Sequence, residues 1–119
     1  MTTQDVANRL VELCRMGQIE EAQKELFAEN ATSTEPEHSP APMPSVTGLD
    51  KIIEKGKHFQ SAIEEFHSST ISEPIVGGNS FAISWAMDVT MKGMGRNSME
   101  EVCVYNVKDG KIVSEEFFF

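Results

Sequence analysis

The sequence predicts an α+β domain in which a cone-shaped, curved antiparallel sheet packs on three N-terminal helices. In the first half of the chain, apolar side chains recur at helical spacing. From residue 67 onward they alternate with polar side chains, which is the pattern of strands. Helices that precede a run of linked strands are typical of α+β proteins. A long bent sheet over helices usually leaves a conical cavity between the two layers.

The composition indicates one globular domain. The chain has 119 residues, of which 39% are hydrophobic, and this length can bury a core without disulfides or metals. A formal net charge of −9 argues against binding to nucleic acid or to an anionic membrane surface. We see no secretory signal and no apolar run long enough to span a membrane. Cys14 and Cys103 lack metal-ligand spacing, so we expect two buried thiols in a reducing cytoplasm.

The first half of the chain contains clear start and stop signals for helices. Thr2 or Thr3 can cap the first helix, and Gly17 ends it. Residues 36–44 hold four of the five prolines and therefore predict a stiff loop. The predicted elements are helices at residues 2–17, 18–28 and 48–65, with a short strand at 31–34.

The second half predicts a meander of strands at residues 67–76, 80–92, 98–107 and 111–119, separated by glycine-containing turns. One face of this sheet packs on the helices. The other carries Ala82, Ala86, Val102 and Val104, which are too apolar for open solvent. We therefore expect a homodimer through the outer sheet face.

Four segments in this order carry a family resemblance. They are "GQIE" at 17–20, "LFAENATSTEP" at 26–36, "GLDKI" at 48–52 and "VYNVKDGKIVSEEFF" at 104–118. Together they resemble the nuclear transport factor 2-like superfamily, in its SnoaL-like and ketosteroid isomerase-related branch. The resemblance implies a cystatin-like cone with an internal pocket, commonly dimerised through the sheet. This superfamily contains isomerases, cyclases, hydrolases, dehydratases and members without chemistry, so the fold alone assigns no function.

The resemblance also implies roles for individual residues. Ketosteroid isomerases place a general-base Asp before a proline on the short strand, and the matching position is Glu35. SnoaL-like cyclases place an acid on the last strand, where Glu115 is the approximate match. Leu10 and Cys103 stand at or near the positions of the isomerase's two oxyanion-stabilising groups, which argues against steroid isomerisation.

Strand alternation offers an independent argument for the site. If the resemblance sets the parity correctly, Glu35, Glu101 and Glu115 point into one apolar cavity, where crowded carboxylates raise one another's pKa and favour acid/base chemistry. A shift of one residue would direct Glu100 and Glu116 inward instead. The predicted lining of the cavity is Leu10, Trp85, Met87, Val89, Cys103, Tyr105, Phe117 and Phe119.

His67 begins a predicted strand and is either an acid/base partner or a histidine at the rim. The spacing of Glu35, His67, Glu101 and Glu115 matches no metal-ligand motif, and the chain has no phosphate loop or nucleophile elbow, so we expect neither metal nor cofactor.

Two functions remain open at this stage. The first is a SnoaL-like protein with an apolar pocket for a small hydrophobic molecule and cofactor-free acid/base chemistry of the isomerase, cyclase or dehydratase type. Glu35 would be the base, and Glu101 or Glu115 the acid. The alternative is a non-catalytic dimeric module that binds a ligand or a partner.

Overall fold

The computed structural model of the protein describes residues 1–41 and 44–119, so Pro42 and Met43 of the predicted proline-rich loop lie outside it. The described residues form three helices and seven strands. The helices are α1 (Thr3–Arg15), α2 (Ile19–Leu26) and α3 (Leu49–Ala62). The strands are β1 (Phe27–Thr34), β2 (Ser45–Thr47), β3 (Ile63–Ile71), β4 (Ile75–Gly77), β5 (Ser80–Met91), β6 (Gly95–Lys108) and β7 (Lys111–Phe118).

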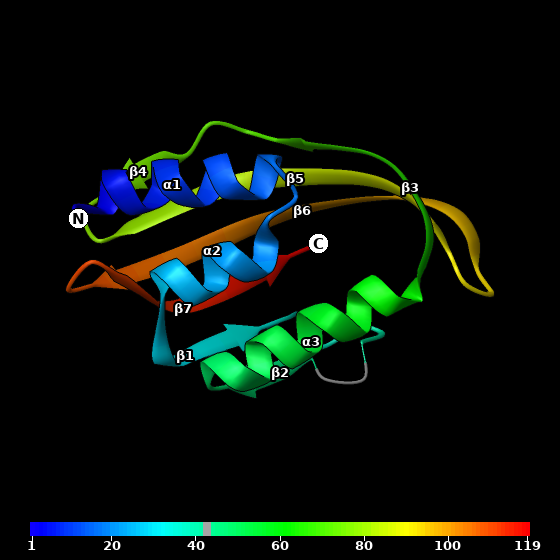
Figure 1. Ribbon diagram of the computed structural model, residues 1–119, viewed down its shortest axis with the longest axis horizontal. Coiled ribbons are helices and arrows are strands. Elements are labelled where there is room, and N and C mark those ends of the chain that lie inside the picture. The colour runs from blue at the N-terminus through cyan, green and yellow to red at the C-terminus, as the bar shows by residue number, and fades with distance from the viewer. Residues whose placement is uncertain (42–43) are drawn as a thin grey trace.

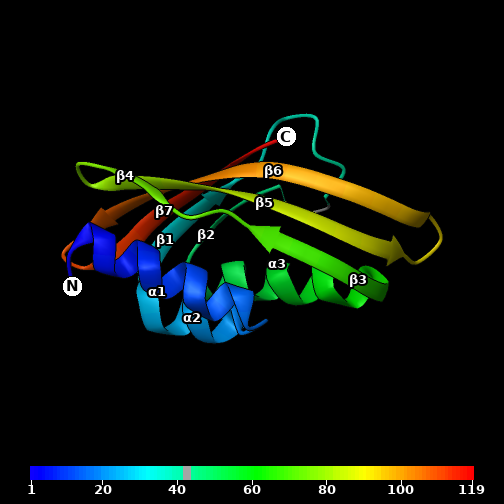
Figure 2. The ribbon, with the colours of Figure 1, turned by 90° about the horizontal axis from the view of Figure 1, so that it is seen from above.

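The strands form one curved sheet in the order β2-β1-β7-β6-β5-β3, and β4 pairs with β5 beside this path. All three helices lie on the same face of the sheet (Figure 2). The β5–β6 hairpin extends beyond the helices at one end of the molecule (Figure 1). This arrangement confirms the predicted α+β class. The sheet is mixed, however, because β1 pairs with β7 in parallel while the other pairs are antiparallel.

The first helix begins and ends where the sequence predicts. The Thr2 hydroxyl accepts a hydrogen bond from the Asp5 backbone N–H at 3.1 Å, and the Thr2 N–H donates to the Asp5 carboxylate at 3.0 Å. This reciprocal capping box satisfies backbone donors that no helical carbonyl can reach. Gly17 follows the helix with a φ of +74°, a conformation that glycine adopts at little cost.

Two predicted boundaries in the first half are wrong by several residues. The second helix ends at Leu26 rather than residue 28, because Phe27 already pairs with Ile112 of β7 in extended conformation. The third helix ends at Ala62 rather than near 65, because Ile63 and Glu65 pair with β5. In both places an apolar residue that fits a helical stripe is taken into the sheet by tertiary pairing.

The predicted strand at 67–76 is in fact two strands. β3 ends at Ile71, and a short β4 begins at Ile75, with Pro74 directly before it. Proline cannot donate to a strand ladder, so it separates the two strands. β6 begins at Gly95 instead of residue 98, which lengthens the hairpin with β5.

The hydrophobic core lies between the sheet and the helices. It includes Leu10 of α1, which is 2% exposed, and both cysteines, which are free thiols. The rings of Phe81 and Tyr105 stack with their centroids 4.8 Å apart, and the ring of Phe27 lies edge-on to Tyr105. Among the residues that the structure describes, no helix is both long and apolar enough to cross a membrane.

Candidate functional site

The inner face of the sheet places the predicted site residues in successive rows. In the pairing of β5 with β6, Phe81 lies opposite Tyr105, Ile83 opposite Cys103, and Trp85 opposite Glu101. β7 extends two of these rows, with Glu115 opposite Tyr105 and Phe117 opposite Cys103. The predicted parity of the strands is therefore confirmed. Glu100 and Glu116, the alternative pair, are exposed on the opposite face.

The last strand and β1 bring two further polar residues to the same interior. Ser33 of β1 pairs with Glu115 and is fully buried. Two residues later along the chain, Glu35 lies on the same side, and its side chain is only 14% exposed. We call Glu35, Glu101 and Glu115 the glutamate cluster.

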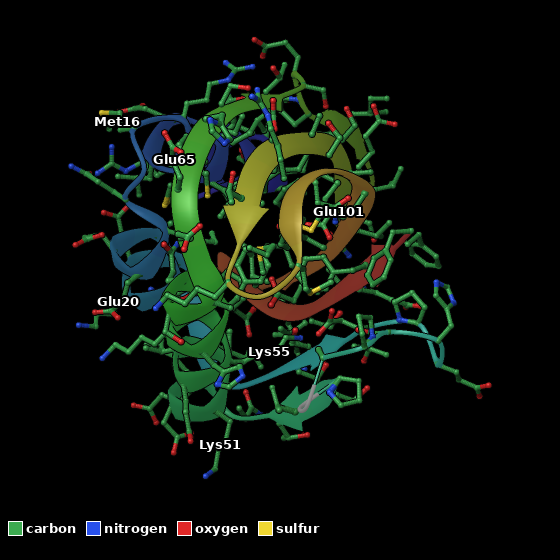
Figure 3. The ribbon with its side chains drawn as sticks, turned by 90° about the vertical axis from the view of Figure 1, so that its right-hand side faces the viewer. Met16, Glu20, Lys51, Lys55, Glu65 and Glu101 are labelled. Carbon is green, nitrogen blue, oxygen red and sulfur yellow. The ribbon has the colours of Figure 1, made fainter. Side chains whose placement is uncertain are left out.

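One lysine from the helix layer reaches the glutamate cluster. The ammonium group of Lys55, on α3, lies 2.9 Å from the Glu35 carboxylate and donates to the Ser33 hydroxyl at 3.0 Å. It also lies 5.2 Å from the centre of the Phe117 ring, within cation–π distance. Figure 3, which looks at the end from which the β5–β6 hairpin projects, shows Lys55 on the helix side of the interior and Glu101 on the strand side.

Burial controls the protonation of Glu115. Its side chain is 6% exposed, and desolvation raises its pKa from 4.5 to about 7. A hydrogen bond from Ser33 and the charge of Lys55 oppose this rise, while Glu101 and Glu35 add to it. Near neutral pH, Glu115 therefore exchanges between an acid and a carboxylate.

The same physics acts on Glu101 and the neighbouring thiols. Burial raises the pKa of Glu101, and a hydrogen bond from the Cys103 thiol at 3.5 Å partly offsets the rise. Burial and the charge of Glu115 raise the pKa of Cys14 to about 12. Burial also raises the pKa of Cys103. Both cysteines are therefore neutral thiols near pH 7.

Trp85 carries an unusual polar atom. Its side chain points from β5 to the inner face beside Glu101, and its indole Nε1–H is buried. Among residues 1–41 and 44–119, no side-chain or backbone atom accepts a hydrogen bond from it. A buried donor without an acceptor is rare, because it loses its hydrogen bonds to water without replacement.

The remaining predicted lining residues differ in their surroundings. Leu10, Val89, Cys103 and Tyr105 are fully packed core residues, whereas Met87 and Phe117 are half-buried. Phe119 does not line the interior. It is 46% exposed at the chain end, and its ring lies edge-on to His38. The sheet ends one residue earlier, so strand alternation no longer directs this side chain.

His67 does not join the glutamate cluster. Its ring nitrogen Nε2 lies 2.7 Å from the Thr90 hydroxyl, and Thr90 is on the outer face of β5, opposite in direction to the buried Val89. The pairing of β3 with β5 shifts between Phe66 and Ser68, so His67 sits in a bulge. A bulge redirects a side chain in a way that simple alternation does not predict.

Sequence reasoning missed Lys55 and Ser33, although the sequence holds a signal for each. Lys55 falls three residues after the buried Ile52, on the inward stripe of α3 where an apolar residue is expected. Ser33 alternates with the buried Ala31 on β1, which places both on the inner face. In both cases the signal is a polar residue at a position where the helix or strand pattern predicts an apolar one.

Two of the surface hollows formed by the described residues are well defined, and neither is lined by a residue of the glutamate cluster. One, of about 660 Å³, lies between the start of α1 and the β6–β7 turn and includes Thr2, Asn79 and Lys108. The other, of about 480 Å³, lies beside α1 and includes Val11 and Pro74. Among the described residues, no group of three or more His, Cys, Asp or Glu has a geometry that could hold a metal ion. The internal ligand pocket remains a prediction.

The family model of the SnoaL-like domain matches residues 1–119. The chain belongs to this family. A crystal structure from Mesorhizobium loti, described as a proposed SnoaL-like polyketide cyclase and also as a carbohydrate phosphatase, is 32% identical, with full coverage of both chains and a TM-score of 0.93. The predicted membership of the SnoaL-like branch is thereby confirmed.

More distant structures share the fold alone. An NTF2-like protein of unknown function from Burkholderia pseudomallei is 20% identical, with 100% of this chain and 92% of that chain covered and a TM-score of 0.81. A protein of unknown function with a cystatin-like fold from Xanthomonas campestris is 17% identical, with 99% and 90% covered and a TM-score of 0.82. A search of curated proteins found no match.

Proposed function

We propose that this SnoaL-like protein binds a small, largely apolar molecule bearing a carbonyl group between its sheet and its helices, and moves a proton on that molecule without a cofactor. Glu115 is the group that transfers the proton. Its carboxylate takes a proton from the carbon next to the carbonyl, the electron pair moves to the carbonyl oxygen as an enolate, and the proton is then returned to carbon. Isomerisation and cyclisation of carbonyl compounds both begin with this step.

The observation that supports this proposal best is the pKa of about 7 at a buried carboxyl that faces an aromatic and aliphatic interior. A general acid or base works best when its pKa lies near the working pH. The designation of the Mesorhizobium loti relative as a proposed polyketide cyclase supports the same class of chemistry.

The ion pair between Glu35 and Lys55 changes the roles that the sequence suggests. Glu35 matches the general base of the isomerases, but its carboxylate is engaged by Lys55 at 2.9 Å and by the Ser39 hydroxyl at 3.2 Å. A carboxylate whose oxygens already accept from these two donors is less available to take a proton from a ligand. We therefore assign proton transfer to Glu115 and a supporting, charge-balancing role to Glu35 and Lys55.

Deuterium exchange tests the proposal without knowledge of the natural substrate. The probe is 2-acetylnaphthalene in D2O, whose methyl group next to the carbonyl exchanges its protons only through an enol or enolate. We expect the protein to accelerate this exchange, and the rate to rise as pH passes through about 7, where Glu115 becomes a carboxylate. Loss of the methyl signal in proton NMR measures the rate.

Glu115→Gln should lower the protein-dependent rate by about 100-fold or more, the usual contribution of a general base. Glu116→Gln is the matched control, because Glu116 is the exposed neighbour on the opposite face. Equal exchange rates in the two variants would contradict the assignment of Glu115. Binding of the ketone with no acceleration at any pH would instead favour the non-catalytic ligand-binding module.

A further inference from the structure

We infer that the indole N–H of Trp85 is a binding group for an oxygen atom of the ligand, so that the site selects molecules with a carbonyl or enolate oxygen over hydrocarbons of the same shape. This inference rests on the proposed function and adds Trp85 as the residue that donates a hydrogen bond to the ligand. It assigns to Trp85 the hydrogen-bond donor that Leu10 and Cys103, at or near the positions of the isomerase's donors, do not supply.

The first step of the argument is the cost of the unpartnered donor. The Trp85 Nε1 atom is buried, yet it has no hydrogen-bond partner among the described residues. Leaving such a group unsatisfied destabilises the folded protein, and an aromatic side chain without an N–H would avoid that cost. A tryptophan with its N–H directed into the interior therefore indicates an external acceptor.

The second step is the position of Trp85. It pairs directly with Glu101 across β5 and β6, so the two side chains lie side by side on the inner face. The Glu101 carboxyl nevertheless accepts from the Cys103 thiol and not from the indole. The free donor thus borders the glutamate cluster but is not used by it.

The third step is the chemistry of the missing partner. The indole N–H can only donate, so its partner must offer a lone pair. Another buried acid would be repelled by the glutamate cluster, which already holds three carboxyl groups against the single cation of Lys55 among the described residues. A neutral oxygen acceptor, such as a ketone carbonyl, satisfies the donor without adding a charge. If that oxygen becomes an enolate during the reaction, the hydrogen bond strengthens as charge develops.

The surroundings of Trp85 favour an apolar body for the same ligand. The next row of the inner face, one step toward the projecting end of the hairpin, consists of Met87 and Met99, both half-buried. Methionine side chains adapt their shape to what they contact. A flat hydrophobic ligand with one oxygen near Trp85 matches this row.

A matched pair of probes tests the inference. The two compounds are 2-acetylnaphthalene and 2-ethylnaphthalene, which have similar shape but differ in the carbonyl oxygen. Because Trp85 is the only tryptophan of the chain, nitrogen-15 labelling gives one indole N–H resonance. We expect the ketone to move this resonance downfield and to bind about tenfold more tightly than the hydrocarbon.

Two changes at Trp85 remove the donor. Trp85→Phe, which also shortens the ring system, should abolish the tenfold preference for the ketone, so that the two probes bind this variant equally well whatever their absolute affinity. If this variant folds poorly, biosynthetic replacement of the single tryptophan by benzothienylalanine keeps the bicyclic ring and replaces N–H with sulfur. The same loss of preference is expected in that protein.

The outcomes separate the inference from the proposed function. If both probes bind equally well and the indole resonance does not move, the role of Trp85 is wrong, while the pocket and the proton transfer by Glu115 still stand. If neither probe binds, the apolar pocket itself is wrong, and the inference fails with it. Retention of the ketone preference in both donor-free proteins also overturns the inference.

Discussion

Burial of Glu115 destabilises the folded protein when the carboxyl group is charged, and it also brings the pKa of that group near neutral pH. Its carboxyl lies 6% exposed in the interior, with one hydroxyl and one ammonium group nearby to support its charged form. Two further glutamates oppose that form. The balance leaves the proton loosely held near neutral pH, which a surface glutamate cannot achieve.

This balance predicts a dependence of stability on pH. The pKa of Glu115 in the folded protein, about 7, lies above its value of 4.5 without the fold, so folding favours the protonated acid. The stabilisation is complete below about pH 4.5 and is lost as pH rises through about 7. The increase in the pKa of Glu115 on folding corresponds to a loss of about 3 kcal/mol in the free energy of unfolding across this pH range.

Glu115→Gln should remove this dependence, because glutamine stays neutral. We expect the variant to gain up to about 3 kcal/mol relative to the native protein between pH 5 and pH 8. Urea denaturation at several pH values measures the difference, and Glu116→Gln serves as the control that should follow the native protein. Parallel pH curves for the native protein and Glu115→Gln would show that Glu115 titrates normally.

At the residue scale, the sequence predicts the direction of a side chain correctly within a regular strand but not in a bulge or beyond a strand end. Glu101, Glu115 and Trp85 reach the predicted face because alternation along β5, β6 and β7 is regular. His67 and Phe119 do not, since one lies in a bulge and the other beyond the last strand pair. The ion pair of Lys55 with Glu35 joins residues 20 positions apart in separate elements, and no local pattern encodes that contact.

At the element scale, the errors share a physical cause. Phe27 and Ile63 each continue the apolar stripe of a helix, yet each is the first residue of a strand. Apolar residues at such junctions satisfy both periodicities, so pairing with β7 or β5 decides the outcome. The parallel pairing of β1 with β7 could not be predicted from the sequence either, because it joins segments from opposite ends of the chain.

The start of α3 determines whether Lys55 reaches the glutamate cluster. Gly48 precedes this helix with a φ of +105° and a ψ of +137°, a conformation that residues with a Cβ rarely adopt. Its N–H donates to the Ala31 carbonyl of β1 at 2.8 Å, which ties the helix start to the strand that carries Ser33. A Cβ at this position would lie 2.8 Å from the Asp50 carboxylate.

Gly48→Ala should therefore lower the free energy of unfolding by about 1–3 kcal/mol. Gly56→Ala is the matched control, because Gly56 lies within α3 and an added Cβ meets nothing within 4 Å. That control should stabilise the protein by about 0.5–1 kcal/mol. Thermal unfolding followed by circular dichroism distinguishes them, and equal melting temperatures for the two variants would rule out strain at Gly48.

At the scale of the whole molecule, the outer face of the sheet has no helix packed on it among the described residues. The three helices all lie on the opposite face (Figure 2). Val102 and Phe118 pair directly on this outer face and are 45% and 48% exposed. Ile75, 77% exposed, continues the same face through its pairing with Ala82. We call Ile75, Ala82, Val102, Val104 and Phe118 the outer apolar patch.

We propose that a second copy of the chain covers this patch. The patch runs across four strands, and polar residues pair with its members on the same face, with Ser84 opposite Val102 and Glu116 opposite Val104. Protein interfaces combine apolar and polar side chains in this way. Two sheets packed face to face would bury the apolar side chains on both copies at once. A two-fold arrangement is the simplest that lets one patch serve both partners.

The expected mass by sedimentation equilibrium is therefore twice 13.2 kDa. Val102→Glu places a charge at the centre of the patch and should yield a folded monomer, since the residue is exposed in the single chain. Met16→Glu adds the same charge at an exposed apolar residue just after α1, on the helix side, and should leave the dimer intact. A native protein that sediments as a monomer at tens of micromolar would refute the sheet-face dimer. A Met16→Glu variant that dissociates as readily as Val102→Glu would show that net charge, and not the outer apolar patch, controls assembly.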